Sequence, residues 1–333
     1  MGFRGWDKDV VRLPDGTSVD ASCPVIVSAS RSTDVPAFFA DWFMSRLRAG
    51  YVRWVNPFNA DQTQYVSFSR TRVIVFWSKN PRPLIRHLAE IDEKGINYYF
   101  QFTVNDYEQE RLEPHVAPLA QRIETFRQLS ERVGKKRVIW RFDPLILTDE
   151  LTVDRLVDRV ARVAEQIKSF TERLVISFAD IAVYTKVRNN LAREHVHYHE
   201  FTPDLMVEIA KRLQTLNQQW GLKIATCAEA VALEPYGIEH NRCIDDRLMI
   251  DVFRQDRTLM DFLGYETDLF ADPSRPYMKD KGQRKECGCI VSKDIGMYDT
   301  CRHLCAYCYA NTSCKAVENN LRRHRDDSDA IVS

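Results

Sequence analysis

Short apolar runs alternate with longer amphipathic stretches along most of this chain. Apolar runs of this length, rich in β-branched and aromatic residues, are typical of strands buried on both faces of a parallel sheet. They predict seven strands, at Pro24 to Ala29, Tyr51 to Val55, Val73 to Trp77, Tyr98 to Thr103, Arg137 to Phe142, Leu174 to Phe178 and Lys223 to Cys227.

Stretches with a helical period lie between most of these strands and end at glycines. Asp34 and Pro36 suit the cap and first turn of a helix that ends at Gly50. No helix is indicated between the second and third strands, where Gln64 to Ser69 alternates and predicts an extra strand. Further helices are predicted at Pro83 to Lys94, His115 to Val133, Thr152 to Lys168 and Pro203 to Trp220.

Strands separated mostly by helices predict an α/β fold with a parallel sheet and right-handed crossovers. An eighth strand within Gly288 to Tyr298 would complete the (β/α)8 count of a TIM-type barrel. We expect one such domain over residues 21–320, which includes a cysteine-rich segment at 287–314. A small N-terminal extension at 1–20 precedes it, and a polar tail at 321–333 follows it, in which Arg322 to Asp329 is expected to be solvated.

Three cysteines near the end of the chain have the spacing CxxxCxxC. Cys301, Cys305 and Cys308 fall within eight residues, so a short loop can bring their thiols around one inorganic cluster. No fourth cysteine follows at a regular interval, which leaves one iron of a 4Fe-4S cluster open to a small ligand. A structural zinc knuckle is the alternative, although no CxxC pair is repeated as zinc ribbons require.

With Tyr307 before its third cysteine, this motif resembles that of radical S-adenosylmethionine (radical SAM) enzymes. The version CRHLCAYCYAN is similar to the motif of spore photoproduct lyases. The whole layout, with SASRSTDVP early, FWSKNP in the first third and the cysteines last, resembles a bacterial family of unknown function that is distantly related to radical SAM proteins.

The resemblance implies a 4Fe-4S cluster that binds S-adenosylmethionine and, once reduced by a flavodoxin or ferredoxin, generates a 5′-deoxyadenosyl radical. Radical SAM enzymes usually carry the motif after the first strand, whereas here it lies some three hundred residues along the chain. Because the last strand of a closed barrel lies beside the first, we expect a circularly permuted barrel. Its cluster loop should then pack beside Pro24 to Ala29.

The chain has nine cysteines, and six of them lie within residues 287–314. An odd, crowded set favours metal ligation over a disulfide framework. Cys287 and Cys289 form a CxC pair that, with Cys227 and Cys243, would supply four thiolates for a second iron-sulfur cluster or zinc. Cys314 is a spare candidate. Alternatively, Cys227 and Cys243 are simply buried small apolar residues.

Polar residues recur where the predicted strands end, on the face where barrel enzymes build their active sites. Three long cationic side chains, Arg31, Lys79 and Arg141, lie at strand ends. They predict an anionic ligand group, such as the SAM carboxylate or a substrate phosphate. Asp34 and Asp143 can alternatively serve only as helix caps or turn residues. The candidate cofactor-binding residues are Arg31, Asp34, Ser78, Lys79, Asn80, Gln101, Arg141, Asp143 and Tyr307. His195, His197 and His199 alternate and could face one metal, but such runs are more often solvated loops.

Composition is ordinary for a globular protein, with 44% hydrophobic and 28% charged residues. Lys plus Arg equals Asp plus Glu, at 47 each, so charge does not favour nucleic acid despite the LRRHR segment at 321–325. No membrane-spanning or secretory segment is evident, and we expect a cytoplasmic enzyme with a small-molecule substrate. The alternatives are a DNA lesion repair lyase and a non-catalytic zinc-binding scaffold.

Overall fold

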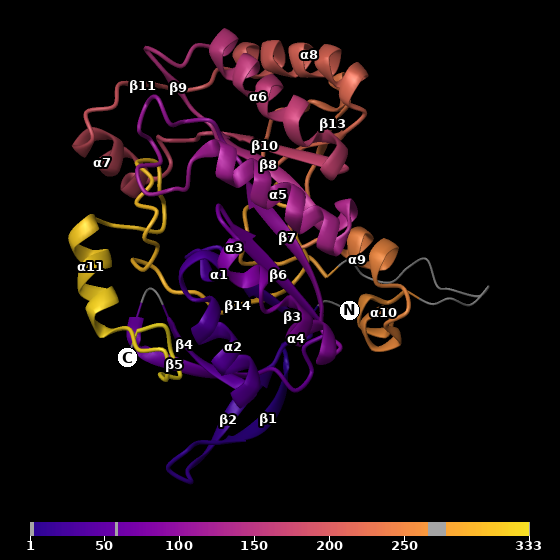
Figure 1. Cartoon of the computed structure of the whole chain (residues 1–333), viewed down its shortest axis with the longest axis vertical. Coiled ribbons are helices and arrows are strands. Elements are labelled where there is room, and N and C mark those ends of the chain that lie inside the picture. The colour runs from indigo at the N-terminus through magenta and orange to yellow at the C-terminus, as the bar shows by residue number, and fades with distance from the viewer. Residues whose placement is uncertain (1–2, 57–58, 266–277, 333) are drawn as a thin grey trace.

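An eight-stranded parallel sheet forms the centre of the computed structural model, which describes residues 3–56, 59–265 and 278–332 (Figure 1). All neighbouring strands in it are parallel. Their spatial order is β13 (Ile238–His240), β12 (Lys223–Thr226), β10 (Arg173–Phe178), β8 (Val138–Leu145), β7 (Asn97–Thr103), β6 (Val73–Ser78), β3 (Ile26–Ala29) and β14 (Lys293–Asp294).

The predicted α/β class is therefore confirmed. An eighth strand does lie within the expected segment, because β14 precedes the three-cysteine motif and pairs with β3. Within the described residues β13 and β14 stand at opposite ends of the strand order and do not pair with each other. The strand pairs thus form an open sheet and do not close it into a barrel.

Helices follow most of the strands, and several begin at the caps that the sequence indicates. Asp34 and Thr202 accept hydrogen bonds from the first turns of their helices, and Gly50 and Gly221 end helices in the left-handed conformation. The helices are α1 (Val35–Phe38), α2 (Ala40–Ala49), α3 (Arg82–Ile85), α4 (Leu88–Glu93), α5 (Leu119–Val133), α6 (Val153–Ile167), α7 (Thr185–Arg193), α8 (Pro203–Trp220), α9 (Asp246–Val252), α10 (Arg257–Leu263) and α11 (Cys314–Arg323), with 3-10 turns η1 (Lys135–Arg137), η2 (Lys168–Phe170) and η3 (Glu234–Tyr236). None of the described helices is both long and apolar enough to cross a membrane.

The two faces of the sheet are covered by different parts of the chain. Alternation along β6 sends Ile74 and Phe76 to the face that packs against α5, α6 and α8, and sends Val73 and Val75 to the other, inner face. The inner face is covered by α9, α10 and the segments that carry Cys243, Cys287 and Cys289. Toward the strand ends this inner face becomes polar, with Gln101 on β7 and Arg141 on β8.

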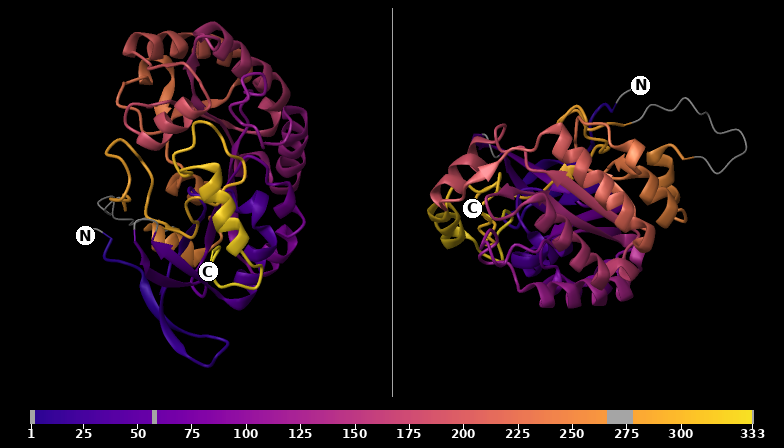
Figure 2. Two further views of the ribbon diagram at one scale, coloured as in Figure 1. Left: turned by 90° about the vertical axis from the view of Figure 1, so that its left-hand side faces the viewer. Right: turned by 90° about the horizontal axis from the view of Figure 1, so that it is seen from above.

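A second sheet of four strands lies at one end of the molecule, and its β1–β2 hairpin projects from it (Figure 2). Its order is β1 (Asp7–Arg12), β2 (Ser18–Cys23), β5 (Asn59–Ser67) and β4 (Tyr51–Asn56). The assignment of Tyr51 to Val55 to the central sheet was therefore wrong. With no helix after it, this strand pairs antiparallel with β5, the extra strand that the alternation indicated.

The missing member of the central sheet is β13, which the sequence did not reveal. Two of its three residues are exposed, so it lacks the apolar run of a buried strand. A separate two-stranded pair, β9 (Leu147–Thr148) with β11 (Tyr198–His199), lies outside both sheets.

The polar tail expected at 321–333 ends, in its last described residues, in buried apolar side chains. Ile331 and Val332 are each 3% exposed. Asp329 forms an ion pair with Arg53 of β4 at 2.9 Å, and the Trp42 indole donates to the Ser328 carbonyl. The chain end therefore packs back against the four-stranded sheet and α2.

Candidate functional site

The three-cysteine loop begins directly after β14 and lies beside the first strand of the central sheet. Asp294, the last residue of β14, pairs with Ser28 of β3. Its carboxylate accepts hydrogen bonds from Ser28 Oγ at 2.9 Å, Ser30 Oγ at 2.8 Å and the Arg31 backbone N–H at 2.8 Å. Further along the loop, the Tyr309 hydroxyl donates to the Arg31 carbonyl at 2.5 Å. The loop thus packs where the late position of the motif predicted.

The three thiols of this loop are free and largely covered. Cys305 is buried, while Cys301 and Cys308 are half-buried. Burial is the main reason that the pKa of each thiol is raised, and at Cys301 the neighbouring Cys308 adds to the effect. The Asn311 backbone N–H donates to Cys308 Sγ at 3.3 Å, and the Asn311 side chain donates to the Cys301 carbonyl at 2.8 Å. Asn311 therefore holds the first and third cysteines of the motif.

Beside Cys305 lies a buried cluster of Lys79, Asn105, Glu113 and Tyr307. Lys79 Nζ donates to Glu113 Oε1 at 2.7 Å and to the Tyr307 hydroxyl at 2.9 Å, and that hydroxyl itself donates to Glu113. Asn105 Nδ2 donates to Glu113 Oε1 at 3.1 Å and to the Tyr307 hydroxyl at 3.0 Å. This cluster, which we call the Glu113 cluster, ties the residue before the third cysteine to the ends of β6 and β7.

The charges within the Glu113 cluster are strongly coupled. Burial alone would raise the pKa of Glu113, but Lys79 and Arg122 outweigh it and lower the pKa to about 2. Burial would likewise lower the pKa of Lys79, but the Glu113 carboxylate raises it. Lys79 is thus already neutralised by a carboxylate within the chain.

Asp34 serves both as a helix cap and as a connector to the thiol loop. Its carboxylate accepts from the Ala37 N–H at 3.0 Å, from Ser78 Oγ at 2.7 Å and from the Lys79 N–H at 2.7 Å. His303, inside the CxxxCxxC motif, places Nε2 2.8 Å from the same carboxylate. Asn80 is half-buried and donates its backbone N–H to Ser78 Oγ at 2.9 Å.

Arg141 lies on the inner face within a second polar group. It donates to Asp143 at 2.6 Å, to Gln101 Oε1 at 3.1 Å and to Cys243 Sγ at 3.1 Å. Asp143 is also joined to the Glu113 cluster, because its backbone N–H donates to Asn105 Oδ1 at 2.9 Å. Two of the three predicted cations, Lys79 and Arg141, are therefore paired with carboxylates.

Arg31 differs from the other two cations. Its guanidinium lies 5.4 Å from the centre of the Trp77 ring, against which Arg141 also packs at 5.3 Å. Within the described part of the chain, Arg31 Nη2 and Thr33 Oγ1 are buried and have no hydrogen-bond partner. Two polar groups in the segment between β3 and α1 are thus available to a ligand.

The four other candidate ligands come together at the inner face. Cys227 Sγ lies 3.6 Å from Cys243 Sγ, and Cys243, Cys289 and Cys287 are close enough in turn to shift one another's pKa. The contact with Cys227 lowers the pKa of Cys243. The interaction with Cys289 and burial outweigh this effect and raise the pKa from 9.0 to about 11. We call these four residues the thiol row.

No three side chains of Cys, His, Asp or Glu among the described residues surround one point closely enough to hold a single metal ion as they stand. His195, His197 and His199 are exposed, and His199, which belongs to β11, lies 2.7 Å from Asp149, so this run faces solvent. Cys314 is exposed at the start of α11.

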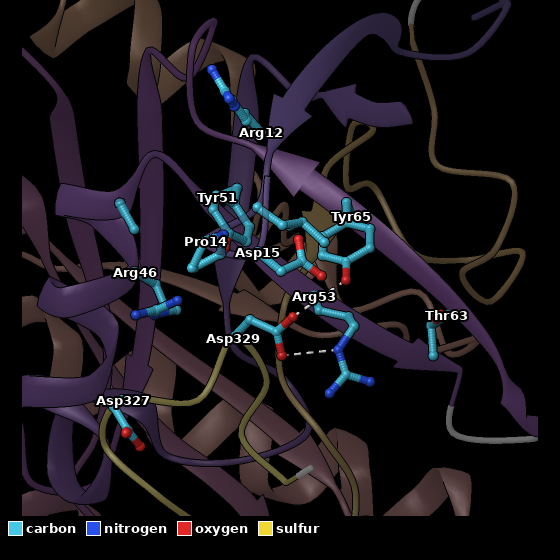
Figure 3. A pocket seen from close by; sticks show the side chains of 12 residues that line it. Arg12, Pro14, Asp15, Arg46, Tyr51, Arg53, Thr63, Tyr65, Asp327 and Asp329 are labelled. Atoms are coloured by element: carbon cyan, nitrogen blue, oxygen red, sulfur yellow. Dashed lines mark hydrogen bonds and ion pairs between the residues drawn. The ribbon is translucent and has the colours of Figure 1, made fainter. Parts of the chain in front are cut away.

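A cavity of about 970 Å³ lies away from both groups of thiols, on the four-stranded sheet (Figure 3). It is lined by three arginines and three aspartates, and Arg53 and Tyr65 both contact Asp329 within it. None of the candidate site residues lines it, and its open, charge-balanced lining shows no arrangement of reactive groups.

Sequence reasoning did not single out Glu113, His303 or Asp294, although each holds part of the site. His303 could have been identified from the sequence, because it lies inside the cysteine motif. Glu113 and Asp294 are isolated acids with no spacing pattern, and only the fold shows what they contact.

Comparison with known families assigns the chain to one of them. The model of a domain of unknown function, DUF1848, matches residues 26–310. The chain belongs to the DUF1848 family. Both groups of thiols lie within the matched region, whereas Cys314 lies beyond it. A family of unknown function is what the overall layout predicted.

No curated protein matches this DUF1848 chain. Among solved structures, a candidate α-L-fucosidase from Bacteroides thetaiotaomicron matches at 10% identity and a TM-score of 0.25. The match covers 59% of this chain and 74% of the other. A score this low carries no argument about fold or function.

Proposed function

We propose that this DUF1848 protein is a radical SAM iron-sulfur enzyme whose 4Fe-4S cluster is held by Cys301, Cys305 and Cys308. When bound and given one electron by a flavodoxin or ferredoxin, the cluster would cleave S-adenosylmethionine to methionine and a 5′-deoxyadenosyl radical, which would abstract hydrogen from a small-molecule substrate. The observation that carries the proposal is the position of the three free thiols: one loop, directly after a strand of a parallel sheet, at the edge where α/β enzymes bind their ligands.

The residues present fit such a cluster. The three thiols come from one loop, none is in a disulfide, and the Asn311 N–H already points at Cys308 Sγ. Each thiolate of a 4Fe-4S cluster binds a different iron, so the sulfurs are spaced more widely than around a single ion. The absence of a single-ion site among the described residues therefore does not count against a cluster.

The end of β3 fits the amino acid part of S-adenosylmethionine. Arg31 Nη2 and Thr33 Oγ1 are buried without partners, and the Tyr309 hydroxyl ties this turn to the thiol loop. An arginine donor with no acceptor is the group expected to bind a carboxylate. Lys79 and Arg141 instead have a structural role. Each is paired with a carboxylate of the chain, and these pairs hold the ends of β6 and β8 in place.

We further propose that the fold is a circularly permuted radical SAM barrel that lacks full strand closure. The pairing of β14 with β3 supports this, since it gives the cluster loop the neighbour that a first barrel strand would have. The Glu113 cluster and Asp34 then position the loop through Tyr307 and His303.

The test is anaerobic reconstitution of the full chain with iron and sulfide. We expect a broad visible absorbance and about four irons for this cluster, lost when Cys301, Cys305 and Cys308 are all replaced by alanine. Cys314→Ala is the matched control, because its exposed thiol lies outside the motif, and it should keep the colour. After reduction, incubation with S-adenosylmethionine should release 5′-deoxyadenosine.

Two outcomes would overturn the proposal. Iron-sulfur colour that persists in the triple variant would assign the cluster elsewhere. Zinc bound to these three thiols, with no iron taken up, would favour the zinc scaffold instead.

A further inference from the structure

The thiol row joins segments that are far apart along the chain. Cys227 follows β12, Cys243 follows β13, and Cys287 and Cys289 precede β14. Since β13 and β14 stand at opposite ends of the strand order, the row bridges the two sides of the sheet that no described strand pair connects. These four thiols have no part in the function proposed above.

The distance between the sulfurs of Cys227 and Cys243 matches that between two ligands of one ion. A tetrahedral ion with metal–sulfur bonds of about 2.3 Å places its sulfurs about 3.8 Å apart. Cys227 Sγ and Cys243 Sγ are 3.6 Å apart, close to that value and well beyond the roughly 2 Å of a disulfide bond. Sulfurs bound to different irons of a cluster would stand farther apart, so the geometry favours a single ion.

N–H groups surround these sulfurs as they would surround thiolates. Arg141 Nη1 and Asn241 Nδ2 lie 3.1 and 3.0 Å from Cys243 Sγ. The Ile244 backbone N–H donates to Cys289 Sγ at 3.4 Å. A neutral thiol is a weak acceptor, whereas a metal-bound thiolate normally receives such hydrogen bonds.

The surrounding charge also fits. Four thiolates around a divalent ion carry a net charge of minus two, which burial makes costly without nearby cations. Arg141 touches Cys243, and Arg31 interacts electrostatically with Cys289 and Cys243. Two guanidinium groups would therefore balance the charge of the loaded site.

Close packing at Gly288 holds the two halves of the row together. A Cβ at this position would lie 2.8 Å from Arg242 Cγ and 3.0 Å from the Asn241 carbonyl oxygen. Only glycine permits the CxC turn to approach the loop of Cys243 so closely. As described, the four sulfurs form a row and not a cage, so binding of one ion requires the Cys287 and Cys289 side chains to rotate toward Cys227 and Cys243.

We propose that Cys227, Cys243, Cys287 and Cys289 bind one zinc ion in a tetrahedral site that joins the two ends of the sheet. Zinc is the ion that four thiolates in this geometry select, and a closed set of four protein ligands is typical of a structural site. The ion would fix β14, and with it the start of the three-cysteine loop, against the β12 and β13 side.

The experiment measures zinc on the full chain by elemental analysis and by native mass spectrometry. We expect about one zinc per chain. Cys243→Ser and Cys289→Ser should each lose it, while the Cys23→Ser and Cys314→Ser controls should keep it. Replacement of Cys301, Cys305 and Cys308 should also leave it bound, which separates this proposal from the function proposed above.

A second measurement uses wild-type protein alone, so it does not depend on whether the variants fold. Wild-type protein exchanged with cobalt(II) should show the intense visible absorption of a tetrahedral tetrathiolate complex. Absence of any bound ion in wild-type protein, iron and sulfide in place of zinc, or zinc retained by both variants would each overturn the proposal.

Discussion

Glu113→Gln should destabilise this protein strongly, because it removes the carboxylate of the Glu113 cluster and leaves Lys79 and the neighbouring Arg122 without it. The Glu113 side chain is 3% exposed, and it lies 2.7 Å from Lys79 and 3.5 Å from Arg122. Glutamine keeps the shape and an acceptor oxygen for Tyr307, so the change tests charge and not packing.

The size of the effect follows from the pKa of Glu113, which is lowered from 4.5 to about 2. At about 1.4 kcal/mol for each pH unit, this carboxylate stabilises the fold by about 3 kcal/mol. Removal of one partner from a buried ion pair typically costs about 3–5 kcal/mol, which agrees. We therefore expect Glu113→Gln to lose about 3 kcal/mol of unfolding free energy at pH 7.

The pH dependence gives the sharper test. Because the folded pKa is lower than the unfolded one, the contribution is complete above pH 4.5 and disappears as the pH falls toward about 2. Wild type and Glu113→Gln should therefore converge in acid. Urea unfolding followed by tryptophan fluorescence at several pH values measures both.

Glu90→Gln is the control, since Glu90 pairs with Arg48 at 2.5 Å on the surface, with the arginine side chain 53% exposed. An exposed pair of this kind contributes at most about 1 kcal/mol. A loss at pH 7 no larger than that of Glu90→Gln would refute the reasoning. So would a difference from wild type that stays constant between pH 7 and pH 3.

Three further predictions concern the loop and the chain end. Burial lowers the pKa of Lys293 to about 8, so its charge opposes folding below that pH and ceases to do so as the pH rises toward 10.5. Lys293→Met should thus be more stable than wild type at pH 7, with the difference shrinking by pH 10 in parallel urea titrations; an unchanged difference would contradict this. In Gly296→Ala the new Cβ would lie 1.8 Å from Ser30 Oγ, so thermal unfolding should show a loss of about 1–3 kcal/mol that Gly282→Ala does not share. Deletion of residues 330–333 removes the buried side chains of Ile331 and Val332, besides that of Ala330, and should cost about 3–6 kcal/mol in urea unfolding, whereas loss of a fraying tail would cost nothing.

The elements that the sequence predicted well are those whose local pattern decides their state. Val73 to Trp77 and Tyr98 to Thr103 are buried on both faces, and their apolar runs identify them directly. The helix at Pro203–Trp220 carries its own cap, first-turn proline and terminal glycine. The pattern of cysteines likewise identified both groups of thiols as candidate ligands from the sequence alone.

What the sequence could not give is decided by distant partners. Tyr51 to Val55 has the pattern of a buried strand, yet it pairs with β5 because the chain between them contains no crossover helix. The exposed β13 carries no apolar run, and its place depends on β12 alongside it. The charged chain end looks solvated until the pairing of Asp329 with Arg53 is known.

The position of the three-cysteine loop depends on contacts at both ends of β14, because the strand itself is only two residues long. After the strand, the Asp294 carboxylate accepts from Ser28, Ser30 and two backbone N–H groups, those of Arg31 and Gly296. Before the strand, Cys289 Sγ accepts a hydrogen bond at 3.4 Å from the Ile244 N–H, across the gap in the sheet. A zinc ion at the thiol row would therefore do more than stabilise a loop. It would hold the amino end of β14 while Asp294 holds the carboxyl end, so that the three thiols that follow are presented at a fixed place beside Arg31.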